Sequence, residues 1–90
     1  MAKVKFTSAL KRFFPTVSEM ETQGITVKET LENIEQTHPG ILRYLTDDNG
    51  QLRRHVNIFV KGELIKDRVT LNDRVAAQDE ILIFQALSGG

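Results

Sequence analysis

One segment of the chain, residues 26–37, has the apolar spacing of an amphipathic helix, and shorter alternating segments lie on both sides of it. Three apolar side chains recur at i, i+4 and i+7 and would form one stripe along this helix: Val27, Leu31 and Ile34. Thr26 and Glu29 have the spacing of a capping box, whose side chains accept hydrogen bonds from free backbone N–H groups. A helix with one apolar face must pack against another element, so we expect the flanking segments to form a sheet.

The flanking segments alternate polar and apolar residues, as strands do when one face of a sheet is buried. We expect strands over 3–10, about 16–22, 56–60, 63–65 and 80–85. Residues 11–15 interrupt the first alternation and predict a turn, and Lys61-Gly62 predicts the two-residue turn of a hairpin. Helices between runs of strands indicate the α+β class, with a mixed sheet of four to five strands packed on one main helix.

The connections complete this pattern. We expect a short helical turn at 41–45, an exposed loop at 47–50 and a polar connection over 66–78. Three apolar side chains are expected to anchor that connection in the core: Val69, Leu71 and Val75. The second strand is expected to turn two apolar residues inward and two acidic ones outward: Val17 and Met20, and Glu19 and Glu21.

Size and charge exclude several classes of protein. The 90 residues fit one domain, which we expect over 1–86, followed by a flexible tail at 87–90. Lys and Arg number 12 and Asp and Glu number 12, and this balance argues against a general nucleic-acid binder. The N-terminus lacks the apolar run of a signal peptide, and no run approaches the ~18 apolar residues of a membrane span. We therefore expect a cytoplasmic protein that does not bind membranes.

Motifs for metal binding and nucleophilic catalysis are missing from the sequence. The lack of cysteine removes disulfides, thiolate metal sites and thiol nucleophiles. His38 and His55 have no partner at metal-ligand spacing, and His38 lies at a predicted helix end, where an imidazolium would offset the helix dipole. We expect no metal, no bound cofactor and no catalytic residue in this chain.

Two stretches of the chain carry a resemblance to a known family. One is Val56-Asn57-Ile58-Phe59-Val60-Lys61-Gly62, and the other runs from Asp79-Glu80-Ile81 to Ser88-Gly89-Gly90. With the strand order, they resemble the ubiquitin-like β-grasp family, and more closely the ThiS/MoaD-like sulfur carriers of the thiamin and molybdopterin pathways. The chain departs from the carriers at Ala77-Gln78, where they have Asp-Gly, so we expect Gln78 in a left-handed position that is mildly strained.

The resemblance implies a role for the C-terminal glycines. In the carriers, a separate adenylyltransferase related to ubiquitin-activating enzymes uses ATP to adenylate the terminal carboxylate, which then becomes a thiocarboxylate. The match carries this role to Gly90, and Gly89 and Gly90 without side chains allow close backbone approach in a narrow channel. The protein would then be a substrate rather than an enzyme, and an acceptor synthase of thiamin, molybdopterin, cysteine or a related thiol pathway would receive its sulfur.

Strand alternation also predicts a surface for partners. Phe59, Leu82 and Phe84 are expected on the face turned away from the helix, where they would form an apolar patch beside the tail. Phe59 and Phe84 match the hydrophobic recognition patch of ubiquitin-like proteins. The alternative is that one phenylalanine folds over an edge of the sheet as peripheral core.

Three further residues are candidates for partner binding. Leu87 would insert into a groove of the partner, or would be a tail residue without a role. Arg53 and Arg54 precede the third strand and would steer an acidic partner, or would serve solubility only. We expect the isolated protein to be a monomer.

Other functions stay open at this point. The chain could be the small subunit of a molybdopterin synthase, whose tail enters the active site of a larger subunit. It could be a ubiquitin-like modifier joined to lysines through Gly90, or a binding module whose tail has no function. The pathway that receives the sulfur depends on the acceptor enzyme, and the sequence does not identify it.

Overall fold

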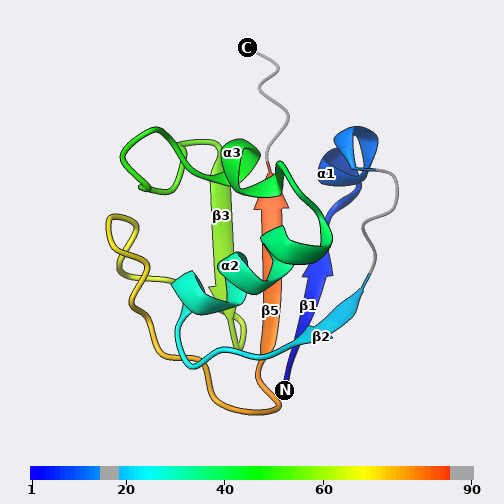
Figure 1. Ribbon diagram of the computed structural model, residues 1–90. Helices are drawn as coiled ribbons and strands as arrows, with labels where there is room; N and C mark the ends of the chain where they lie inside the picture. The colour runs from blue at the N-terminus through cyan, green and yellow to red at the C-terminus, as the bar shows by residue number, and fades with distance from the viewer. Residues whose placement is uncertain (15–18, 86–90) are drawn as a thin grey trace.

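The computed structural model describes residues 1–14 and 19–85 (Figure 1). In chain order the elements are β1 (Ala2–Phe6), α1 (Ser8–Phe13), β2 (Met20–Thr22), α2 (Val27–Thr37), α3 (Ile41–Leu45), β3 (Val56–Val60), β4 (Glu63–Leu64) and β5 (Glu80–Gln85). The strands form one sheet in the order β2-β1-β5-β3-β4, in which β1 and β5 are parallel and the other neighbours antiparallel. The predicted α+β class, with a mixed sheet on one main helix, is confirmed. Within the described residues, no helix has the length and apolar character that crossing a membrane requires.

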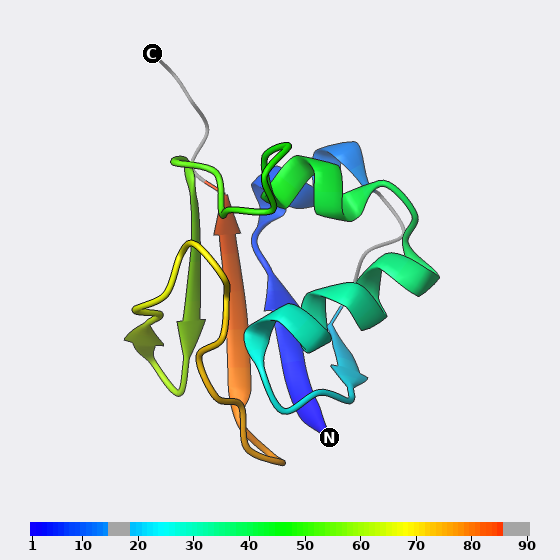
Figure 2. The same ribbon diagram turned by 60° about the vertical axis from the view of Figure 1, so that its left-hand side comes forward.

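The main helix, α2, begins with the predicted capping box. The Thr26 hydroxyl accepts a hydrogen bond from the backbone N–H of Glu29 at 3.2 Å, and Glu29 Oε1 accepts one from the N–H of Ile25 at 3.1 Å. The apolar stripe of the helix is buried: Val27, Leu31 and Ile34. Figure 2 shows α2 and α3 together on one side of the sheet. The opposite face of the sheet therefore carries the alternate side chains of each strand.

Strands β3 and β5 supply the sheet side of the core. Ile58 of β3 lies opposite Ile83 of β5, and both side chains are fully buried, as is Ile81. Burial of one such side chain stabilises the fold by about 1.5–3 kcal/mol. A slip of either strand by one residue would turn the buried isoleucines of that strand to the other face, so the register is strongly specified.

The N-terminal segment differs from the prediction. A strand over 3–10 followed by a turn over 11–15 is wrong, because β1 ends at Phe6 and α1 follows it. Leu10 of α1 is fully buried, so this helix covers part of the core that a longer strand would leave open. Its six residues make fewer than two turns, too few for helical periodicity to be distinguished from strand alternation.

The second strand is shorter than the predicted segment at about 16–22. β2 begins at Met20, which is half-buried and packs against the core, while Glu19 and Glu21 are exposed, as expected. The other residue expected to point inward, Val17, lies outside the described residues.

The helical turn at 41–45 and the exposed loop after it form as predicted, the former as α3. Glu35 joins α3 to α2, because its carboxylate accepts hydrogen bonds from the backbone N–H groups of Gly40 at 3.0 Å and Leu42 at 2.9 Å. These two bonds hold the pKa of Glu35 below its ordinary value. The carboxylate thus fixes the angle at which α3 follows α2.

Two of the three predicted anchors of the 66–78 connection are buried: Leu71 and Val75. The prediction for Val69 is wrong, since its side chain is 56% exposed. Asp67 causes this difference, because its Oδ1 accepts hydrogen bonds from the backbone N–H groups of Val69 and Thr70 and closes a turn that points Val69 outward. The Thr70 hydroxyl and these backbone bonds hold the pKa of Asp67 well below its usual range.

Two tight turns adopt left-handed backbone conformations where the sequence predicts them. The hairpin between β3 and β4 turns through Lys61 with φ 56° and Gly62 with φ 80°, the type I′ pattern that matches the twist of paired strands. Gln78 has φ 75°, so the position where the carriers have glycine is indeed left-handed here.

Candidate functional site

The site is organised by the C-terminal end of β5, which is the central strand of the sheet. The last described residue, Gln85, pairs with Val56 of β3, and its N–H lies 3.4 Å from the hydroxyl of Thr7. Thr7 in turn donates its own N–H to the carbonyl of Ile83 at 3.2 Å. The end of β5 is thus held between the start of β3 and the start of α1, and the chain continues from this point to its last residues.

Three predicted site residues follow this point in the chain: Leu87, Gly89 and Gly90. They lie outside the described residues, so their roles stay predictions.

The sheet face opposite the helices carries the predicted apolar patch. Phe59 lies directly opposite Leu82, and both are half-buried, while Phe84 is 40% exposed. Phe59 and Leu82 line a hollow of about 240 Å³ together with Gly62 and Glu80. The expectation that these three side chains face away from the helix is confirmed, and none of them folds into the core.

Sequence reasoning missed one member of this surface, Leu64. It pairs with Phe59 in the hairpin and is 49% exposed. The signal was available, because a two-residue turn at Lys61-Gly62 fixes this pairing and residues directly opposite in a sheet share a face. We call Phe59, Leu64, Leu82 and Phe84 the apolar patch.

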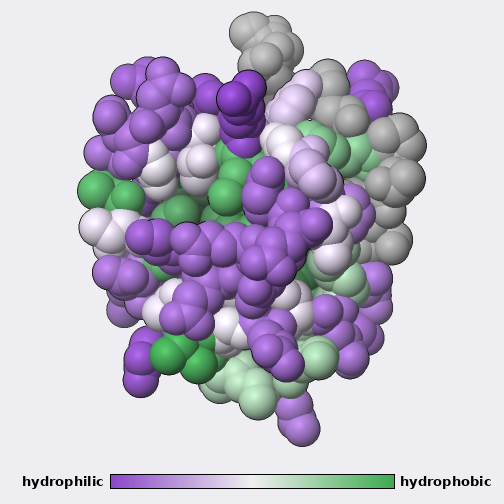
Figure 3. Space-filling view, viewed as in Figure 1, coloured by the Kyte–Doolittle hydropathy of each residue, from purple (hydrophilic) through white to green (hydrophobic). Residues whose placement is uncertain are grey.

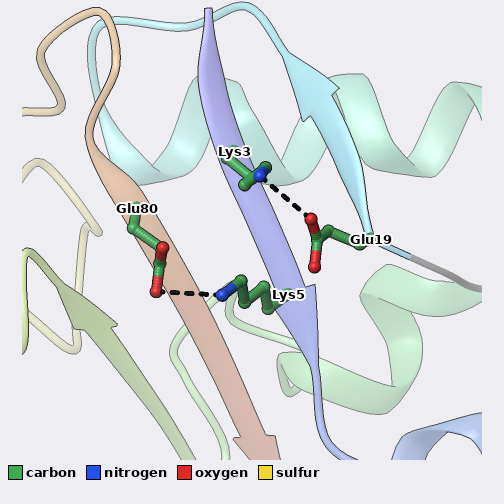
Figure 4. Close-up of polar contacts among 4 residues, drawn as sticks. All are labelled: Lys3, Lys5, Glu19 and Glu80. Carbon is green, nitrogen blue, oxygen red and sulfur yellow. Dashed lines mark ion pairs between the residues drawn. The ribbon is translucent and has the colours of Figure 1, made fainter.

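Charged residues occupy the other half of the same face (Figure 4). Lys3 pairs with Glu19 at 3.1 Å, and Lys5 pairs with Glu80 at 3.4 Å. The Lys3–Glu19 hydrogen bond and attraction raise the pKa of Lys3 and lower that of Glu19. All four side chains are substantially exposed, so these pairs contribute little to stability, but they mark a polar border beside the apolar patch.

Arginines gather near the end of β5, at the start of β3. Arg53 donates its backbone N–H to the carbonyl of Leu45 at 2.9 Å and its Nε to the carbonyl of Arg43 at 3.0 Å. Arg43 and Arg54 are exposed. A hollow of about 340 Å³ lies here, lined by Arg43, Tyr44, Arg53 and His55. The structure therefore adds Arg43 of α3 to the two arginines predicted from the sequence.

A fourth arginine, Arg68, has a structural position behind these three. Its Nη2 donates to the carbonyls of Arg53 at 2.6 Å and Val56 at 2.9 Å, and its Nη1 donates to Asn57 Oδ1 at 3.1 Å. Asn57 pairs with Phe84 across β3 and β5. Arg68 thus fixes the segment that carries Arg53 and joins it to the apolar patch.

The helix face of the molecule is mainly hydrophilic, with apolar surface exposed beside α2 (Figure 3). A hollow of about 330 Å³ lies on this side, with Leu31, Leu42 and Leu71 among its lining residues and Lys28 and Glu32 beside them. Its volume is at the small end of the range of ligand pockets, and its lining residues do not pair a nucleophile with a base.

The described residues contain no group of three or more His, Asp or Glu that could hold a metal ion. His38 caps the C-terminus of α2, where its N–H donates to the carbonyl of Ile34 at 2.8 Å and its Nδ1 lies 3.0 Å from the Thr37 hydroxyl. His38 therefore has the structural position that its place in the sequence predicts.

Comparison with known proteins assigns this arrangement to a family. Residues 4–90 match the model of the ThiS family. Over 65 residues, which are 72% of this chain and 70% of the relative, the sequence is 32% identical to small archaeal modifier protein 1 of Haloferax volcanii.

Solved structures agree with the sequence match. A chain in the Amycolatopsis orientalis BexX/CysO complex superposes with a TM-score of 0.85 and 26% identity, each chain covering the other fully. CysO of Mycobacterium tuberculosis superposes with a TM-score of 0.83 and 25% identity over 97% of this chain and 100% of that one. These neighbours confirm the predicted ubiquitin-like β-grasp fold. With a family model that matches almost the whole chain, this protein belongs to the ThiS family.

Proposed function

We propose that this protein is a sulfur carrier whose Gly90 carboxylate is adenylated and converted to a thiocarboxylate. One observation carries the proposal: the ThiS family model matches the chain through residue 90. The protein is homologous to small carrier and modifier proteins rather than to catalysts.

The chemistry requires two steps at one carbonyl carbon. A Gly90 carboxylate oxygen attacks the α-phosphorus of ATP, pyrophosphate leaves, and an acyl-adenylate forms. A sulfur nucleophile supplied as sulfide then attacks the carbonyl carbon, AMP leaves with the bonding electrons, and the thiocarboxylate remains. The first step is necessary because a carboxylate is a poor electrophile, whereas AMP is a good leaving group.

The residues around β5 support this function by their arrangement. The chain leaves the sheet from its central strand, so an enzyme that receives the tail must also contact the surface beside that strand. The apolar patch supplies such a surface, because a contiguous group of exposed apolar side chains usually marks a site of protein–protein contact. The structural neighbour CysO forms a complex with BexX, and we propose that this chain likewise docks on an enzyme that accepts its sulfur.

The test is intact-mass spectrometry after incubation with the cognate activating enzyme, ATP and a sulfide donor. We expect AMP release and the mass change of one oxygen replaced by one sulfur. A variant that lacks Gly90 is the matched control, since it keeps the whole described fold. Unchanged mass without AMP release from the full chain would contradict the proposal.

The relative in Haloferax volcanii, a modifier protein, favours conjugation to other proteins as a second function. A lysine amine would then attack the carbonyl carbon of the same acyl-adenylate, AMP would leave with the bonding electrons, and an isopeptide bond would form at Gly90 with loss of the amine proton. Arg74 is the last basic residue of the chain, so trypsin would leave residues 75–90 attached to the modified lysine. Detection of this branched peptide in cells identifies a modifier, and its absence beside a thiocarboxylated carrier identifies a carrier only.

A further inference from the structure

Arg43 and Arg53 line one hollow next to the start of β3, and exposed Arg54 follows Arg53 in the chain; we call these three residues the arginine cluster. They come from two places in the sequence, α3 and the turn before β3. Two hydrogen bonds join these places: the Arg53 N–H to the Leu45 carbonyl at 2.9 Å and the Arg53 Nε to the Arg43 carbonyl at 3.0 Å. The cluster is therefore built by the fold and is fixed relative to the strand that leads to the tail.

The position of the cluster follows from strand pairing. Arg53 accepts a hydrogen bond from the N–H of Val56 at 3.1 Å, and Val56 pairs with Gln85, the last described residue of β5. In Figure 1, α3 and the start of β3 lie at the same end of the sheet as the arrowhead of β5. An enzyme that binds the chain beyond Gln85 would therefore bind next to the arginine cluster.

The ion pairs of the described residues join carboxylates to lysines and do not involve the arginine cluster. Among the described residues, none of the three arginines forms an ion pair. The charge of Arg43 contributes to the lowered pKa of Glu35, but the carboxylate oxygens of Glu35 accept their hydrogen bonds from the backbone N–H groups of Gly40 and Leu42. Asp47 likewise accepts two backbone N–H groups in its own loop. No carboxylate among the described residues therefore forms an ion pair with these guanidinium groups, although the chain as a whole has a formal net charge of zero.

The donors that remain define the ligand chemistry. Arg53 uses only its Nε within the described residues, which leaves its two Nη groups to form a bidentate pair with a carboxylate. The hollow of about 340 Å³ between Arg43, Tyr44, Arg53 and His55 has room for side chains of a partner. The Arg68–Asn57 hydrogen bond connects the cluster to the strand pair that carries Phe84, so one partner surface could cover both the cluster and the apolar patch.

We infer that the arginine cluster docks a carboxylate-rich surface of the activating enzyme, next to the apolar patch, when that enzyme takes up the tail. This inference rests on the proposed function. The apolar patch would supply contact area, and the cluster would speed encounter and fix orientation, which is the usual contribution of rim charges. A phosphate group of enzyme-bound ATP has similar chemistry, and the test separates it from the carboxylates.

The experiment measures AMP release by the cognate activating enzyme as a function of carrier and ATP concentration. Arg43→Gln, Arg54→Gln and the double variant are compared with the parent chain, because both side chains are exposed and neither holds the fold together. Each single change is expected to raise KM for the carrier about two- to fivefold, the range of an exposed charge pair, with KM for ATP unchanged. The difference should shrink as ionic strength rises from about 0.01 to 0.15 M, over which the Debye length falls from about 30 to 8 Å.

Two further variants sharpen the test. Arg74→Gln removes an exposed arginine without an ion pair among the described residues, on the connection beside the N-terminus of α2, and should leave KM unchanged. Arg54→Lys keeps the charge and should restore most of the affinity. Equal KM values for the parent and the double variant would overturn the inference while the proposed function stood. A rise in KM for ATP would assign the cluster to phosphate instead, and no AMP release by the parent chain would overturn both proposals.

Discussion

Glu35→Gln tests how the helix that carries Arg43 is held in place. The Glu35 carboxylate accepts hydrogen bonds from Gly40 at 3.0 Å and Leu42 at 2.9 Å, one to each oxygen. A glutamine keeps one acceptor oxygen and presents an amide NH₂ to the other N–H, so one bond is lost and two donors face each other. Because the side chain is only half-buried, we expect a loss of about 1–2 kcal/mol in the free energy of unfolding at pH 7.

The contribution of Glu35 to stability should depend on pH in a defined direction. The two bonds lower the pKa of Glu35 in the folded protein below the ordinary value of 4.5. Its contribution to stability is therefore complete above pH 4.5 and is lost as the pH falls through the folded pKa. Urea unfolding of both proteins from pH 7 down to about 3 should show a difference that narrows toward the acid end, as Glu35 becomes a neutral acid like the glutamine. A difference that stays constant over this range, or no difference at pH 7, would show that the two backbone bonds do not stabilise the fold in this way.

Three other changes have defined outcomes. Gly24→Ala would place a Cβ 2.8 Å from the hydroxyl of buried Thr30 at a backbone φ of 146°, so urea unfolding should show a loss of about 1–3 kcal/mol, and an unaltered midpoint would contradict the close contact. Gln85→Met should raise stability by about 1 kcal/mol, because Gln85 Oε1 is buried without a hydrogen-bond partner among the described residues; lower stability would show that the oxygen is bonded in the protein. Phe84→Ser should slow AMP release by the activating enzyme, and it should change the free energy of unfolding by less than about 1 kcal/mol because the ring is 40% exposed. Val69→Ser is the control, since Val69 is 56% exposed and lies outside the apolar patch, and it should leave AMP release unchanged. Equal effects of the two changes would count against the patch.

The long helix α2 could be predicted from its period, and the short α3 and β4 were also predicted, whereas α1 was not. Residues 26–37 contain enough turns for the apolar stripe and the capping box to identify α2. α1 has six residues, and the alternation of β1 continues far enough into it to resemble one strand. Val69 was misassigned for a related reason, because the Asp67 turn that points it outward depends on several backbone N–H groups that no spacing pattern reveals.

For the candidate site, the alternation of side chains along single strands was enough to predict which residues face away from the helices. The alternation in β3 and β5 correctly placed Phe59, Leu82 and Phe84 on the open face, because side chains in a strand alternate strictly. The sequence also predicted Arg53 and Arg54 as a charged pair. It offered no way to add Arg43, which lies ten positions earlier and meets Arg53 only through the packing of α3.

Local patterns were enough to predict the elements with a strong period, the hairpin turn and the face to which the side chains of β3 and β5 point. All of these depend on neighbours within a few residues. The tertiary structure decided that β5 lies in the centre of the sheet between β1 and β3, and that α3 meets the turn before β3 beside the end of β5. Such contacts join segments distant in the chain, and only the burial of one shared core selects them from the alternatives that local patterns allow.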